Sequence, residues 1–249
     1  MTRKILLTPE YKNQRKDVEQ IVNNFELNGE IVHKGRNTIK TFQTEFGSWN
    51  VKRYHKPSLL NRFVYSFFRK PKGERAFIYP ERVLAASCET PNPVAYIEDR
   101  NSFGLINFSY FISQHCPYSR RFYEFGDTPV EKCTDILTAF AFFTARMHEN
   151  GIYHRDYSPG NILFDFVNDQ WHFSIVDINR MQFGPISIKK GCQNFARLWG
   201  QPEFFHFLAL AYAHENRQPY VLFYFSHNTT HLFGLYESSV YFLTLTMLP

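Results

Sequence analysis

The stretch His154-Arg-Asp-Tyr-Ser-Pro-Gly-Asn161 decides the fold expected for this chain, together with two apolar runs that follow it. The polar pair Asn168-Asp169 separates the runs, and Asp177 closes the second one. Two apolar runs on either side of a short polar turn are typical of a β-hairpin. Asn161 lies about seven residues before the turn and Asp177 about eight after it, so pairing would bring both to the open end of the hairpin.

Oxygen-bearing side chains would then meet at one point. Asn161 and Asp177 would face each other there, and Asp156 would lie beside them in the preceding loop. Magnesium takes few protein ligands, prefers oxygen, and fills its remaining positions with water and phosphate. The spacing therefore predicts a magnesium site formed by Asn161 and Asp177.

A helix is expected immediately before this loop. Thr128-Pro-Val-Glu131 has the pattern of a capping box with proline at the first helical position, and Gly151 stands where a left-handed residue ends a helix. Apolar residues recur at spacings of three and four, which predicts one buried stripe. The stripe consists of Val130, Cys133, Leu137, Phe140, Thr144 and Met147.

The first half of the chain has the period of strands. Strands are expected at 31–32, 38–46 and 49–54, and 94–97 and 105–113 form a second predicted hairpin. Strands first and helices later predict an α+β protein of two lobes. The expected divisions are a loose lead-in at 1–27, a nucleotide-binding N-lobe at 28–115, a helical C-lobe at 116–217 and an apolar tail at 218–249.

Composition limits the classes of protein to consider. The 249 residues are 44% hydrophobic and 20% charged, which excludes a wholly disordered chain, and 18% are aromatic. Four cysteines without a C-x-x-C pair argue against a zinc ribbon or a disulfide framework. The basic N-terminus has an apolar run too short for a signal peptide, and no segment is long enough to span a membrane. We expect a cytoplasmic protein without a helical anchor.

The net charge of +5 is concentrated in one segment. Between Lys52 and Arg75 the only acid is Glu74, so the segment favours an anionic partner. Such a stretch is usually a solvated face, and the alternative is that it binds an anionic sugar phosphate or lipid headgroup, with peripheral contact to the inner face of the cytoplasmic membrane. We expect no nucleic acid. The basic residues are Lys52, Arg53, Lys56, Arg62, Arg69, Lys70, Lys72 and Arg75.

The pattern His154-Arg-Asp-x-x-x-x-Asn161 with a later Asp177 resembles the catalytic loop and metal-binding aspartate of the protein-kinase-like superfamily. Shorter pieces make the chain similar to the lipopolysaccharide core kinases of bacteria, which phosphorylate Kdo or heptose sugars of the inner core. These pieces are Lys34-Gly-Arg-Asn-Thr-Ile-Lys40, Val51-Lys-Arg-Tyr54, Gly73-Glu-Arg-Ala-Phe77, Thr90-Pro-Asn-Pro-Val94, Tyr153–Leu163 and Val176-Asp-Ile-Asn-Arg180.

The resemblance implies a protein-kinase-like two-lobe fold with a reduced C-terminal lobe, ATP and Mg²⁺ as cofactors, and a role for each matching residue. Asp156 would be the catalytic base or orient the acceptor hydroxyl, and Asn161 and Asp177 would hold Mg²⁺. Lys52 would contact the α- and β-phosphates, and Glu74 would pair with it. The remaining implied nucleotide contacts are Gly35, Arg36 and Asn37 over the phosphates, and Ser113 and Cys116 at the adenine.

The chain departs from the protein-kinase pattern in several places. The phosphate loop has one glycine, and Asp177-Ile-Asn179 replaces D-F-G, where asparagine tolerates the left-handed conformation. No A-P-E segment follows, which favours a small, non-peptide acceptor. Pro80 suits the first turn of a helix, so a helix starting near residue 78 would leave Glu74 in a preceding turn and separate it from Lys52.

Several functions remain open at this point. The sequence favours an ATP-dependent kinase that acts on an inner-core sugar. The alternatives are a kinase for another small molecule, a protein kinase, or a pseudokinase that binds a nucleotide without catalysis. For the tail at 218–249, packing on the lobe, contact with a membrane or partner, and an incorrect reading frame beyond about residue 217 are equally open.

Overall fold

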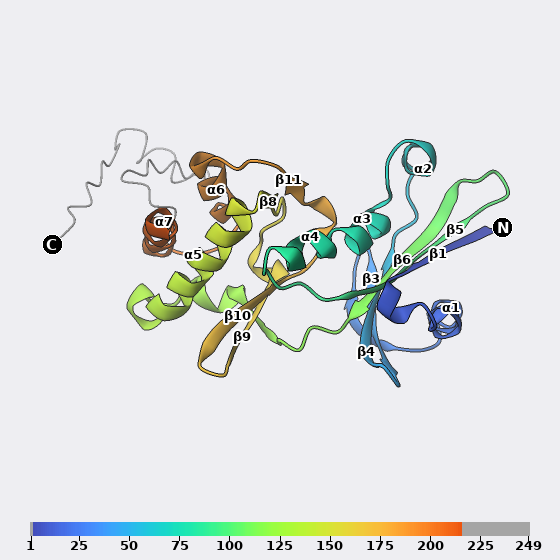
Figure 1. Cartoon of the computed structure of the whole chain (residues 1–249), viewed down its shortest axis with the longest axis horizontal. Coiled ribbons are helices and arrows are strands. Elements are labelled where there is room, and N and C mark those ends of the chain that lie inside the picture. The colour runs from blue at the N-terminus through green and yellow to red at the C-terminus, as the bar shows by residue number, and fades with distance from the viewer. Residues whose placement is uncertain (1, 216–249) are drawn as a thin grey trace. The chain divides into compact units, whose positions relative to one another are not determined.

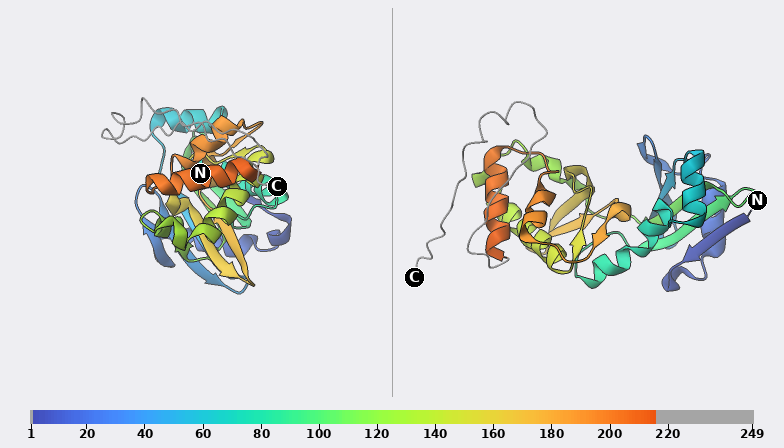
Figure 2. Two further views of the ribbon diagram at one scale, coloured as in Figure 1. Left: turned by 90° about the vertical axis from the view of Figure 1, so that its left-hand side faces the viewer. Right: turned by 90° about the horizontal axis from the view of Figure 1, so that it is seen from above.

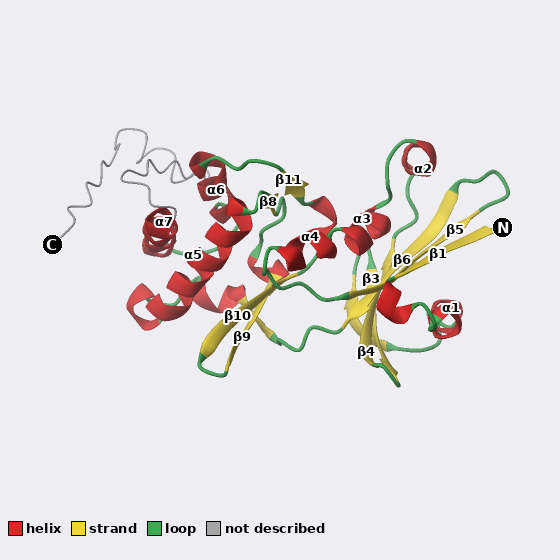
Figure 3. Cartoon of the chain, in the orientation of Figure 1, coloured by secondary structure: helices red, strands yellow, loops and turns green. Residues whose placement is uncertain are grey.

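The computed structural model describes residues 2–215, so the tail predicted at 218–249 lies outside the described residues. Contacts divide the chain into two compact units (Figure 1). Among the described residues, the first unit comprises 2–82, Thr90–Pro117 and Asp177–Arg180, and the second comprises Val83–Glu89, Tyr118–Val176 and 181–215. Strands dominate the first unit and helices the second, which confirms the α+β class (Figure 3).

The first unit is built on a six-stranded antiparallel sheet in the order β1-β5-β6-β4-β3-β2. The strands predicted from alternation are present, including the hairpin of β5 and β6. Their bounds are β1 Thr2–Leu7, β2 Glu30–Lys34, β3 Thr38–Thr44, β4 Gly47–Tyr54, β5 Pro93–Arg100 and β6 Ile106–Gln114. The helices of this part of the chain are the 3-10 helix η1 Pro9–Tyr11 and the α-helices α1 Arg15–Asn23, α2 Leu59–Phe67, α3 Lys72–Ile78 and α4 Pro80–Ala85.

The loose lead-in predicted at 1–27 is wrong. β1 pairs with β5 in register from Thr2 opposite Arg100 to Leu7 opposite Ala95, and it forms one edge of the sheet. Arg3 donates to both carboxylate oxygens of Asp99, at 2.6 and 3.0 Å. An edge strand has a neighbour on one side only and often carries charged residues. The composition of the segment therefore looks polar, and it does not reveal the distant strand with which the segment pairs.

The two faces of this sheet carry different helices, because side chains alternate along a strand. On β4, Trp49 and Val51 join a buried apolar cluster with Val18 and Val22 of α1. On the opposite face, α3 approaches β5 and β6 so closely that a Cβ on Gly73 would lie 2.8 Å from the ring of Tyr96. Lys52 has the parity of this second face.

Within its described residues the second unit combines short strands with three α-helices, and α7 packs beside α5 (Figure 2). Its strands form a three-stranded sheet, β10-β9-β7, and a two-stranded pair, β11 and β8. The strands are β7 Arg120–Arg121, β8 Ile152–Tyr153, β9 Ile162–Val167, β10 Gln170–Ile175 and β11 Gln182–Phe183. The helices are η2 Phe122–Phe125, η3 Val130–Lys132, α5 Thr134–Glu149, η4 Pro159–Asn161, α6 Ile188–Phe195 and α7 Pro202–Glu215.

Aromatic rings form the core of this unit. Phe122 and Phe140 stand 4.1 Å apart between ring centroids, and both rings contact Phe173 of β10. Much of the high aromatic content is therefore buried packing material rather than a binding surface.

The helix expected from Thr128 begins later. A 3-10 turn, η3, occupies Val130–Lys132, and α5 begins at Thr134. The Thr128 hydroxyl donates to the carbonyl of Glu124 at 2.7 Å, so it does not cap the helix that follows. The predicted end is confirmed, because Gly151 has φ +69 directly after the C-cap residue Asn150.

Candidate functional site

The hairpin predicted after Asn161 is present. Ile162 lies opposite Ile175, the turn residues Asn168 and Asp169 both have positive φ, and the N–H of Val176 donates to the carbonyl of Asn161 at 2.9 Å. Asn161 thus sits at the open end of the hairpin, opposite the residue that precedes Asp177.

The loop before the hairpin is held by His154, which is 1% exposed. Its Nε2 lies 3.0 Å from the carbonyl oxygen of Val176, and its Nδ1 accepts from the N–H of Asp156 at 3.1 Å. A carbonyl only accepts and a backbone N–H only donates, so the ring carries its hydrogen on Nε2. His154 therefore packs as a structural residue that ties Asp156 to the end of the hairpin.

Asp156 and Asn161 are joined within this unit. The amide Nδ2 of Asn161 donates to the backbone carbonyl of Asp156 at 2.8 Å. The Asp156 carboxylate lies 3.4 Å from Arg197, whose side chain is 54% exposed, so this ion pair is loose. Arg197 was not identified from the sequence, because it lies 41 residues further along the chain and belongs to no motif.

A buried polar network supports the same loop from behind. Asn194 of α6 is fully buried, and its Nδ2 donates to the carbonyl of His154 at 2.8 Å. Its Oδ1 accepts from Nε2 of His148 at 3.0 Å, and Nδ1 of His148 lies 2.9 Å from the Tyr212 hydroxyl. Burial lowers the pKa of His148 to about 4, which keeps this ring neutral at pH 7. No sequence motif indicates this network, because its members are brought together from distant segments.

In the first unit, Lys52 contacts Asp177. The Lys52 Nζ lies 2.7 Å from Oδ1 of Asp177, and the same oxygen accepts a hydrogen bond from the amide of Asn179. Asp177 has φ +56, so the left-handed residue of this segment is Asp177 and not Asn179, where the sequence placed it. Such a conformation in an aspartate costs of order 1 kcal/mol or more and is concentrated at functional sites.

Cations surround this pair. Lys72 and Arg75 lie on α3, and Arg180 ends the short helix η5 Ile178–Arg180, which packs on α3. Burial lowers the pKa of Lys72, and the neighbouring Arg36, Arg180 and Arg75 lower that pKa further. Positive charge collected beside a carboxylate suits a polyanionic ligand such as a nucleotide phosphate chain.

The ion pair predicted between Glu74 and Lys52 is not formed. Glu74 lies in the first turn of α3, not in a turn before the helix, because the chain forms one helix ahead of Tyr79 and starts a second at Pro80. Its carboxylate pairs with Lys4 of β1 at 3.1 Å. The N-terminal strand, which the sequence did not predict, carries this competing lysine to α3, and a role of Glu74 at the nucleotide stays a prediction.

The remaining predicted contacts occupy two places. Gly35, Arg36 and Asn37 form the connection between β2 and β3, where the Asn37 side chain accepts from the N–H of His55 at 3.1 Å. Ser113 lies on β6 and Cys116 follows it, and both are buried. Their roles as nucleotide contacts stay predictions.

An amide oxygen, as in Asn161, and a carboxylate, as in Asp177, are each the kind of oxygen ligand that Mg²⁺ prefers, and their joint role at a magnesium site stays a prediction. Within residues 2–215 no group of three or more His, Cys, Asp or Glu side chains could hold a metal. Oxygen ligands of this kind suit a magnesium ion that phosphate oxygens also coordinate better than they suit a structural zinc.

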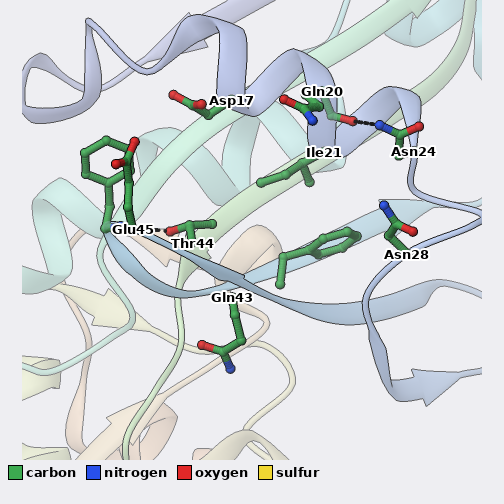
Figure 4. A pocket seen from close by; sticks show the side chains of 10 residues that line it. Asp17, Gln20, Ile21, Asn24, Asn28, Gln43, Thr44 and Glu45 are labelled. Carbon is green, nitrogen blue, oxygen red and sulfur yellow. Dashed lines mark hydrogen bonds between the residues drawn. The ribbon is translucent and has the colours of Figure 1, made fainter.

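A pocket elsewhere in the first unit is lined by α1 and by residues 42–46 (Figure 4). None of the predicted site residues lines it. Its walls carry Asp17 and Glu45, which would repel a phosphate group, so the pocket is a poor candidate for the nucleotide.

Comparisons with known proteins identify a family. The model of the lipopolysaccharide kinase (Kdo/WaaP) family matches residues 25–201. A solved structure of WaaP in complex with acyl carrier protein has a similar fold, with a TM-score of 0.54 at 15% identity, over 87% of this chain and 90% of that one. No curated protein sequence matches the chain significantly.

Proposed function

The chain belongs to the lipopolysaccharide kinase (Kdo/WaaP) family, and from this premise we propose that it transfers the γ-phosphoryl group of ATP to a Kdo or heptose hydroxyl of the lipopolysaccharide inner core. Membership makes the protein a lipopolysaccharide kinase, a phosphotransferase that acts on a sugar hydroxyl. The acceptor sugar and the donor nucleotide are the proposed part.

The observation that carries the proposal is the local geometry of two motifs. His154 and Asn161 hold the Asp156 backbone at the end of the hairpin, and Lys52 binds the Asp177 carboxylate at 2.7 Å. Phosphoryl transfer depends on positioning and on neutralising phosphate charge, and these residue types supply both.

In the proposed reaction, Asp156 orients the acceptor hydroxyl and takes up its proton. A bond forms between the sugar oxygen and the γ-phosphorus while the bond from that phosphorus to the bridging oxygen breaks, so ADP leaves with the electron pair. Lys52 binds the α- and β-phosphates in place of its contact with Asp177. Asn161 and Asp177 would hold Mg²⁺, which when bound neutralises phosphate charge.

The other proposed nucleotide contacts follow the chain. The connection Gly35–Asn37 covers the phosphates, and the backbone from Ser113 to Cys116 meets the adenine. Glu74 reaches Lys52 only if it leaves Lys4, so we propose it as an alternative partner for Lys52 when nucleotide is bound.

Since the acceptor is an anionic glycolipid, we place the enzyme at the inner face of the cytoplasmic membrane. No described helix is long and apolar enough to cross a membrane.

The test incubates the full chain with ATP, Mg²⁺ and dephosphorylated core oligosaccharide, and measures by mass spectrometry a gain of one phosphate. Asp156→Ala should lower the rate by two to four orders of magnitude, whereas Asp135→Ala, which removes an exposed carboxylate from α5, should retain it. Lys52→Ala should weaken ATP binding or turnover. Lys16→Ala, which removes an exposed lysine from α1, is its control.

Other outcomes select the alternatives. Nucleotide binding without transfer by the wild type would make the chain a pseudokinase. Transfer to protein alone would make it a protein kinase. An unchanged rate for Asp156→Ala would overturn the assigned role of that residue.

A further inference from the structure

Two polar side chains of helix α2, Arg62 and Ser66, lie against the sheet. Arg62 is 7% exposed, and its guanidinium donates to the carbonyl of Ile106 at 2.7 Å and to the Asn107 side chain at 2.9 Å. The Ser66 hydroxyl accepts from the N–H of Ile106 at 3.1 Å, and its carbonyl accepts from Arg100 at 3.3 Å. Hydrogen bonds of Arg62 and Ser66 therefore help to anchor α2.

Apart from the half-buried Val64, the aliphatic and Phe side chains of α2 are exposed to solvent, which reverses the usual arrangement of a surface helix. Leu60 and Phe68 are 75% and 76% exposed, and the ring of Phe63 contacts Phe67 and Phe68 at centroid distances of 5.2 and 5.7 Å. Positions 59, 60, 63 and 67 fall on one side of a helix, so the exposed groups adjoin one another. The apolar face consists of Leu59, Leu60, Phe63, Phe67 and Phe68.

Cations flank this apolar face. Lys56 precedes α2, and Arg69 and Lys70 follow it, and all three are exposed. No Asp or Glu occurs between residues 54 and 73. The helix lies outside the sheet, and loops join it to β4 on one side and to α3 on the other (Figure 1). Exposed Leu and Phe bordered by Lys and Arg are the pattern of a helix that lies in a lipid interface.

We propose that α2 docks on an anionic lipid surface. The apolar face enters the boundary between headgroups and acyl chains, and Lys56, Arg69 and Lys70 meet the anionic headgroups. This deepens the proposed function, since it names the element that brings the enzyme to a membrane-embedded acceptor. A second copy of the chain is a poorer occupant, because it would present the same cations and repel.

The test measures co-sedimentation of the full chain with vesicles, in the absence of ATP and acceptor. Vesicles of phosphatidylcholine with phosphatidylglycerol should bind the protein, and vesicles of phosphatidylcholine alone should bind it at least tenfold more weakly. The double variant Phe63→Ser/Phe67→Ser should lose at least tenfold in binding to the anionic vesicles. Leu27→Ser, which removes an exposed leucine after α1, is the matched control and should bind like the wild type.

A second variant separates docking from misfolding. Lys56→Gln/Arg69→Gln/Lys70→Gln leaves the apolar face intact and should also weaken binding, and added salt should have little further effect on it. The Phe63→Ser/Phe67→Ser variant should phosphorylate soluble core oligosaccharide at the wild-type rate, so a failure of the lipid proposal is distinguishable from a failure of the kinase proposal.

Three results would overturn the docking proposal. The first is equal binding of the wild type to neutral and anionic vesicles, and the second is no binding to either. The third is a change of oligomeric state in the Phe63→Ser/Phe67→Ser variant without a change in vesicle binding, which would make the face an interface between copies.

Discussion

Between pH 7 and pH 5 the wild type should lose about 2 kcal/mol more of its free energy of unfolding than the His148→Gln variant loses. His148 is 3% exposed and holds Asn194, which in turn holds the carbonyl of His154 in the catalytic loop. Acid therefore acts on the support of the proposed site, and a glutamine amide can donate to Asn194 and accept from Tyr212 without titrating.

The magnitude follows from two pKa values. Burial lowers the pKa of folded His148 to about 4, against 6.5 for the ordinary group. As pH falls the unfolded chain takes up this proton first, so the contribution of His148 is complete above 6.5 and is lost as pH falls toward 4. Proton linkage gives a loss of about 2 kcal/mol by pH 5 and about 3 kcal/mol by pH 4.

Urea unfolding at pH 7 and pH 5 measures the effect, because comparing the two pH values within each protein cancels any baseline cost of the substitution. His214→Gln, which removes an exposed histidine from α7, should keep the wild-type difference. An H148Q protein that loses as much stability as the wild type would refute the reasoning. So would an NMR titration of the His148 ring with a midpoint near 6.5.

Three further predictions concern packing. Asn194→Ala should lower the free energy of unfolding by about 2–4 kcal/mol, because it leaves the buried His148 N–H and the His154 carbonyl unpaired; urea unfolding measures this, and a loss below about 0.5 kcal/mol would contradict it. Gly191→Ala should destabilise by about 1–3 kcal/mol instead of stabilising α6, since a Cβ there would lie 2.0 Å from the Tyr212 hydroxyl; a raised melting temperature would argue against this contact. Deleting residues 1–8 should lower both melting temperature and solubility, because it uncovers the edge of β5; wild-type values for both would show that β1 adds nothing.

Short-range sequence patterns predicted the local structure around much of the candidate site. The spacing of polar and apolar residues placed Asn161 at the open end of a hairpin whose register the structure confirms, and Gly151 ended its helix as predicted. Such features depend on residues near one another in the chain, whose periodicity and turn chemistry are visible in the sequence. The reversed polarity of α2 was hidden for the opposite reason: a basic segment rich in Phe and Leu does not reveal which side meets the sheet.

By itself the sequence determined the strand and hairpin pattern, the catalytic-loop motif and the family to which the chain belongs. Only the tertiary structure decided the partners of the charged and polar groups: Lys52 with Asp177, Glu74 with Lys4, and the His154 carbonyl with Asn194. Each of these contacts joins residues at least 40 positions apart. Which of several candidate charges comes within 3 Å of another depends on how distant segments pack, and a short-range pattern carries no information about that packing.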